Sequence, residues 1–149
     1  MQNEEPMIKI RQLKIAFGDK VVLDNMDLDV YAGETLAIIG PSGTGKSTVI
    51  KVLTGLLPPN GGSVVIDGQE TGSFDEEQWD ALRKRMGVVF QYSALFDFLN
   101  VGDNVAFGLR RQLRLSEEEI AERVSELLQM VGMPDTQKLL PSELSGGMK

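Results

Sequence analysis

The sequence predicts an α/β fold with an antiparallel β part at the N-terminus and a helical subdomain toward the C-terminus. Three observations support this. Residues 7–15 and 21–30 alternate apolar and polar side chains, which is the period of half-buried strands. Residues 35–39 (TLAII) form a short unbroken apolar run, typical of a strand buried on both faces, and a glycine-rich loop follows it. The last third of the chain changes to helical spacing.

The elements between these regions follow from turn residues and periodicity. A helix is expected over residues 46–57, because two prolines, an asparagine and two glycines come directly after it. Residues 63–67 predict a strand that ends in a turn at Gly68. Residues 76–86 predict an amphipathic helix, and residues 87–90 predict another short apolar strand. We therefore expect a mixed sheet with helices.

The C-terminal part predicts a helix with a defined start. Ser116 and Glu119 have the spacing of a capping box, and apolar residues follow at helical intervals until Gly132. The chain is thus expected to divide into an α/β core over residues 1–91 and a helical subdomain over residues 92–149.

The composition excludes several kinds of site. The chain has 149 residues, of which 42% are hydrophobic and 25% charged, enough for one folded domain. It contains neither cysteine nor histidine, so disulfides, thiolate metal sites and the commonest general base are absent. No apolar run reaches the roughly 18 residues of a membrane-spanning helix, and the polar start MQNEEP does not predict a secretory signal. The net charge of −7 argues against nonspecific binding of nucleic acid.

The glycine-rich loop at residues 40–47 (GPSGTGKS) fits the pattern G-x-x-x-x-G-K-S/T between an apolar strand and a helix. Glycines allow backbone angles that other residues avoid, so successive N–H groups can turn toward one anion. The positive end of the next helix points at the same place. Lys46 is expected to reach the β- and γ-phosphates of a nucleotide, and the Ser47 hydroxyl to bind Mg²⁺. The alternative is a plain glycine-rich turn with an exposed lysine.

Two further motifs follow in order. Gln91 comes directly after the apolar run at residues 87–90, and the sequence LSGGM occupies residues 144–148. With these motifs the chain resembles the ATP-binding subunits of ABC transporters, from about residue 7 to its last residue. Residues 86–110 and the LSGGM variant look most like the Mla-type ATPases, which energise phospholipid transport and tolerance of organic solvents at bacterial envelopes. Met148 stands where the family usually has glutamine.

The resemblance implies a role for each motif. Phe17 would stack on adenine, at a position more often held by tyrosine. Gln91 would touch Mg²⁺ or the attacking water and sense the transmembrane partner, and catalysis would involve Lys46 and Gln91. Ser145, Gly146 and Gly147 would contact the γ-phosphate bound to a second copy. The phosphates would be held by nine consecutive residues: Gly40, Pro41, Ser42, Gly43, Thr44, Gly45, Lys46, Ser47 and Thr48.

Each of these roles has a structural alternative. Phe17 could pack against a hairpin, Gln91 could be a polar strand end, and the residues after Leu144 could form a plain turn, although a helix is expected to begin at Ser145. A basic group could bind anionic lipid or a partner, but a solvated helix face is favoured for it: Arg110, Arg111 and Arg114.

In ABC ATPases, the motif that corresponds to LSGGM is followed by an apolar strand that ends in Asp-Glu (Walker B) and then by a histidine. Neither occurs in these 149 residues. The expectation is therefore an N-terminal, incomplete portion of an ABC ATPase domain, truncated before the Walker B strand. Such a portion is expected to bind nucleotide without efficient hydrolysis and to self-associate through its unpaired strand edge.

The resemblance predicts an ATPase subunit that binds ATP and Mg²⁺ and lies on the inner face of the cytoplasmic membrane. Its expected partners are a second, head-to-tail copy, a transmembrane permease and envelope proteins that bind the transported lipid, and not nucleic acid. Two alternatives stay open: a non-catalytic fragment that only binds nucleotide or dimerises, and a soluble ABC ATPase acting on DNA or ribosomes.

Overall fold

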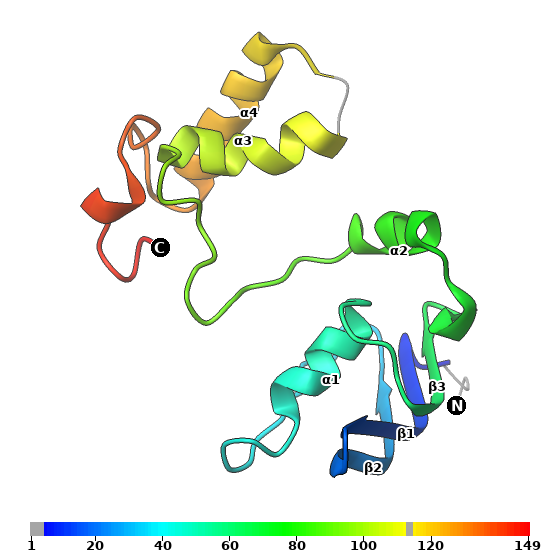
Figure 1. Cartoon of the computed structure of the whole chain (residues 1–149). Helices are drawn as coiled ribbons and strands as arrows, with labels where there is room; N and C mark the ends of the chain where they lie inside the picture. The colour runs from blue at the N-terminus through cyan, green and yellow to red at the C-terminus, as the bar shows by residue number, and fades with distance from the viewer. Residues whose placement is uncertain (1–4, 113–114) are drawn as a thin grey trace. The chain divides into compact units, whose positions relative to one another are not determined.

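The computed structural model describes residues 5–112 and 115–149 (Figure 1). The chain forms two compact units, Met1–Met86 and Gly87–Lys149, and each has its own hydrophobic core. Arg114, one of the three arginines considered above, lies outside the described residues.

The first unit is built on a four-stranded sheet with the order β2-β1-β3-β4. Its strands are β1 (Ile8–Phe17), β2 (Lys20–Val30), β3 (Gly61–Ile66) and β4 (Gln69–Glu70), and all three pairings are antiparallel. The predicted N-terminal antiparallel part is therefore confirmed.

β1 carries a bulge that changes which side chains face the core. Its pairing with β2 shifts register between Ile10 and Leu13, and Gln12 has a φ of 49°. Strict alternation would turn position 13 outward, but the bulge lets Ile10, Leu13 and Ile15 all point inward, where each is at most 1% exposed. The local alternation thus predicted the strand but not its inner face.

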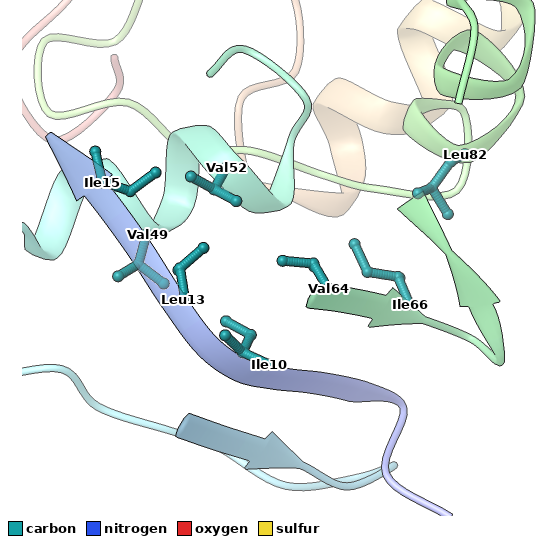
Figure 2. Close-up of a cluster of buried hydrophobic side chains, with 8 residues drawn as sticks. All are labelled: Ile10, Leu13, Ile15, Val49, Val52, Val64, Ile66 and Leu82. Atoms are coloured by element: carbon teal, nitrogen blue, oxygen red, sulfur yellow. The ribbon is translucent and has the colours of Figure 1, made fainter. Parts of the chain in front are cut away.

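The α-helices of the first unit, within its described residues, are α1 (Lys46–Leu53) and α2 (Glu76–Arg83). Both are shorter than predicted. Figure 2 shows Val49 and Val52 of α1 among the β1 side chains, with Val64, Ile66 and Leu82 in the same cluster. This packing holds α1 against the sheet and so places the loop that leads into it.

Two predicted strands are absent from the described part of the chain. Residues 35–39 and 87–90 form neither helix nor strand. Ile39, in the run predicted to be buried on both faces, is 92% exposed, and Val89, in the other predicted apolar strand, is 99% exposed. The reason is that a strand needs a hydrogen-bonded neighbour, and neither segment joins the ladder of the sheet that the structure describes. The mixed sheet is consequently wrong for the described residues.

The second unit consists of α3 (Val101–Gln112) and α4 (Glu117–Met130), followed by a short 3₁₀ turn at Pro141–Glu143. The predicted capping box is confirmed: the Glu119 N–H donates to the Ser116 hydroxyl at 3.2 Å, and the Ser116 N–H donates to the Glu119 carboxylate at 2.7 Å. The sequence placed Arg110 and Arg111 on a helix face, as α3 confirms, but it gave no bounds for this helix. Among the described residues, no helix has the combination of length and apolar character that crossing a membrane requires.

Candidate phosphate-binding site

The loop before α1 depends on glycines at two left-handed positions. Gly43 has a φ of 81° and Gly45 a φ of 93°, a region that side-chain-bearing residues rarely adopt. A Cβ at Gly45 would lie 2.8 Å from Cδ2 of Leu23, whereas one at Gly43 would meet nothing within 4 Å. Gly45 is therefore pressed against β2, and the backbone at Gly43 is open to an approaching group.

The amino end of α1 is suited to an anion. Gly45 is the N-cap residue, no side chain caps this end, and the first turn contains no acidic residue. The first turn of any α-helix leaves N–H groups without partners inside the helix, and the helix dipole makes that end positive. An oxyanion would supply the missing acceptors.

The ammonium group of Lys46 lies across the start of the loop. Its Nζ donates to the carbonyl oxygens of Gly40 at 2.8 Å and Pro41 at 2.6 Å, and the Thr44 hydroxyl also donates to Pro41 at 2.9 Å. Lys46 is half-buried. The loop is thus folded around a positive group beside the positive end of a helix.

The hydroxyls of the first turn differ in exposure. Ser47 is exposed and Thr48 is half-buried, and Pro41 and Ser42 are exposed at the outer part of the loop. An exposed hydroxyl oxygen next to a phosphate-binding turn is an oxygen ligand of the kind that Mg²⁺ prefers. The residues of this loop therefore fit a phosphate chain and its Mg²⁺ by their chemistry.

Phe17 lies at the end of β1, where the hairpin to β2 turns through Gly18 at a φ of 59°. Its side chain is 54% exposed, so part of the ring is open to solvent. Phe17 and the loop at residues 40–48 both belong to the first unit.

The other motif residues belong to the second unit. Gln91 is exposed in a segment without helix or strand. Ser145, Gly146 and Gly147 lie in one exposed turn, which the Met148 N–H closes by donating to the Ser145 carbonyl at 3.0 Å. Leu144, which is 7% exposed, anchors this turn in the core of the unit. The helix expected to begin at Ser145 is only a turn within the described residues.

Comparison with known proteins identifies the family. A family model described as ABC transporter matches residues 23–149. The chain belongs to the ABC transporter family. The match includes the loop before α1, Gln91 and the turn at residues 145–147.

Several relatives of this ABC chain are described as ATP-binding proteins of transport systems. It is 42% identical over 142 residues to the intermembrane phospholipid transport system ATP-binding protein MlaF of Haemophilus influenzae, covering 95% of this chain and 54% of MlaF. It is 43% identical over 145 residues to the sulfate/thiosulfate import ATP-binding protein CysA of Rhodopseudomonas palustris, covering 95% of this chain and 40% of CysA. The chain thus spans about half the length of these curated relatives.

A solved structure shows the same fold. The ATP-binding cassette MJ0796, a dimer in a post-hydrolysis state with ADP and Pi, matches with a TM-score of 0.82 at 32% identity. The match covers 95% of this chain and 64% of that chain. The fold is therefore the α/β fold of an ABC ATPase cassette.

Proposed function

We propose that this chain is the nucleotide-binding portion of the ATPase subunit of an ABC transporter, with ATP as its ligand and Mg²⁺ as the cofactor. One observation carries the proposal. The amino end of α1 has no side-chain cap and no acidic residue, and the Lys46 ammonium lies beside it against two loop carbonyls. This arrangement concentrates donors and positive charge where a triphosphate would bind.

Different groups of the loop bind different parts of the triphosphate. The first-turn N–H groups donate to phosphate oxygens, and Lys46 exchanges its carbonyl partners for phosphate oxygens, which make stronger, charge-assisted hydrogen bonds. Ser47 and Gln91 would hold Mg²⁺, which neutralises negative charge on the phosphates when bound. The exposed ring of Phe17 would stack on adenine.

The turn at Ser145, Gly146 and Gly147 is proposed to act on a second copy of the chain. Its exposed backbone N–H groups and the Ser145 hydroxyl would contact the γ-phosphate held by the partner copy in a head-to-tail dimer. The dimeric state of the similar cassette MJ0796 supports this assembly.

Hydrolysis in the whole subunit is proposed to rest on positioning and charge stabilisation by Lys46 and Gln91, without a covalent intermediate. The 149-residue chain itself is expected to bind nucleotide without efficient turnover. In this sequence no apolar strand ending in Asp-Glu follows Ser145, and there is no histidine.

The transport role is proposed from the likeness to MlaF. We place the subunit on the inner face of the cytoplasmic membrane, where it energises a permease for phospholipids or other hydrophobic compounds, together with envelope proteins that bind them. The comparable identity to CysA makes sulfate one of the competing cargoes. ATPase stimulation of the reconstituted transporter by phospholipid, and not by sulfate, would support the lipid assignment; the reverse would overturn it.

The nucleotide site is tested by calorimetric titration of the 149-residue chain with ATP and Mg²⁺. Lys46→Ala is expected to weaken binding by about tenfold or more, because a hydrogen bond from a charged group to phosphate contributes about 1.5–3 kcal/mol. Lys51→Ala is the matched control, since it removes the same charge from the last turn of the same helix. Equal loss of affinity in both variants would contradict the assigned site.

A further inference from the structure

The carboxyl end of α1 is closed by a tight reversal. The Gly55 N–H donates to the Val52 carbonyl at 3.0 Å, and the Leu56 N–H donates back to the Lys51 carbonyl at 2.8 Å. Gly55 has a φ of 69°, the left-handed conformation that commonly ends a helix.

Trp79 of α2 packs directly on this reversal. A Cβ at Gly55 would lie 2.4 Å from Cδ2 of Trp79, so the indole occupies the space that any side chain there would need. Phe74 meets the indole edge-on, with 5.5 Å between ring centroids and 71° between ring planes. The indole is therefore packed against both Gly55 and Phe74.

Arg83 of α2 binds the carbonyls of the two residues that follow α1. Its Nε donates to the Thr54 carbonyl at 3.0 Å, and its Nη2 lies 3.4 Å from the Gly55 carbonyl. Its Nη1 donates to Glu76 at 2.7 Å and to Asp80 at 3.0 Å, which aims the guanidinium from its own helix. A cation at the carboxyl end of a helix also interacts favourably with the helix dipole.

We propose that Trp79 and Arg83 are positioning residues for the phosphate-binding end of α1. The inference rests on the proposed nucleotide site. Helix α1 has 8 residues, which makes it about 12 Å long, and helices this short are marginal in water without tertiary contacts. Its amino end carries the phosphate donors, so its order depends on contacts made elsewhere on the helix.

The physical link is the population of ordered α1. If the carboxyl turn frays, fewer molecules have an intact first turn at Lys46, and ATP must order that turn at its own cost. Apparent affinity falls in proportion to the fraction of molecules that are competent to bind. The grip of Arg83 on Thr54 therefore acts on ATP through the helix, without touching the nucleotide.

The test measures nucleotide affinity and thermal stability separately in the 149-residue chain. Calorimetric titrations with ATP and Mg²⁺ are run well below the melting temperature of every variant. Arg83→Gln is expected to raise the Kd for ATP by about 2-fold to 30-fold, the range of coupling through packed networks. Arg83→Lys should restore part of the affinity, because an ammonium can still donate to the Thr54 carbonyl.

Arg85→Gln is the matched control. Arg85 follows two residues later and pairs with Asp67, not with α1. Its Kd is expected to equal that of the unchanged chain. Trp79→Leu, which removes the indole from the space over Gly55, should also raise the Kd for ATP. It tests the same inference if Arg83→Gln does not fold.

Trp79 provides a second readout because it is the only tryptophan in the chain. Its fluorescence is expected to change on titration with ATP and Mg²⁺, with the same Kd as the calorimetry, and less in Arg83→Gln than in Arg85→Gln. A lower melting temperature with unchanged Kd in Arg83→Gln and Trp79→Leu would overturn this inference but leave the proposed function standing. Absence of ATP binding in the unchanged chain would overturn the proposed function and the inference with it.

Discussion

Gly45 and Gly43 have the same backbone requirement but different surroundings. Both have positive φ, so a side chain is strained at either position. Only Gly45 also lies against β2, at Leu23 and Val22. The loop therefore uses one glycine to fit against the protein and the other to leave its outer side open.

We expect Gly45→Ala to destabilise the first unit more than Gly43→Ala. Strain costs about 1–3 kcal/mol at each position. Overpacking against Leu23 adds about 1–3 kcal/mol at Gly45 only. Urea denaturation of the two variants measures the difference, and equal losses would show that β2 does not constrain the loop.

Helices α3 and α4 are joined by a charged bridge in addition to their apolar core. Arg110 of α3 donates to Asp103 at 3.0 Å and to Glu117, the first residue of α4, at 2.9 Å. The hydrogen bond from Arg110 is the main reason that the pKa of Glu117 is lowered from its ordinary value of 4.5. Because of this ion pair, the second unit is expected to lose stability as the pH falls.

Glu117→Gln is expected to reduce the loss of thermal stability in acid. A carboxylate whose pKa is lowered on folding stabilises the fold above its unfolded pKa and loses that contribution as the pH falls through the folded pKa. The difference in melting temperature between Glu117→Gln and the unchanged chain should thus be fully present above pH 4.5 and disappear as the pH falls below it. Melting temperatures measured across that range check this.

Glu118→Gln is the control for the acid dependence. It removes a charge from the same first turn, and the described residues include no ion pair to Glu118. A change in acid dependence as large as that of Glu117→Gln would assign the effect to the helix dipole and not to Arg110.

The whole molecule consists of two units with separate cores, and the second unit begins with an exposed segment. Residues 87–92 lie in neither a helix nor a strand, and Phe90 and Tyr92 are 53% and 86% exposed. Each unit can keep its own core when this segment is cut, because no side chain of residues 87–92 belongs to either core cluster. Exposed segments of this kind are preferred sites of proteolysis.

Brief treatment with chymotrypsin is expected to cut first after Phe90 or Tyr92, leaving two fragments that mass spectrometry identifies. Phe74 and Trp79, which pack against the core of the first unit, serve as internal controls and should be cut later. First cleavage within α3 or α4 would contradict the two-unit organisation.

Much of the local structure was predictable because its causes lie within a few residues. The capping box at Ser116 and Glu119 needs only two side chains three positions apart, and it formed as expected. The turn at Gly68 likewise joins β3 to β4 because Asp67 and Gly68 take left-handed backbone angles. The loop at residues 40–48 is recognisable for the same reason.

Other features could not be predicted because they depend on distant partners. The apolar runs at residues 35–39 and 87–90 look like strands, but strand formation needs a neighbouring chain segment and not hydrophobicity alone. The bounds of helix α3 could not be predicted because its helical character is supported by packing against α4 rather than by a clear local signal. A bulge in β1 decided that Leu13 faces inward.

The candidate site divides in the same way. Short-range chemistry determined the candidate phosphate-binding loop: glycines where φ must be positive, a lysine at the first helical position and a first turn free of acid. Long-range folding decided how that loop is held, by Leu23 at the amino end of α1 and by Trp79 and Arg83 at its carboxyl end. A contact between residues far apart in the chain leaves no periodicity to read, so only the folded structure reveals it.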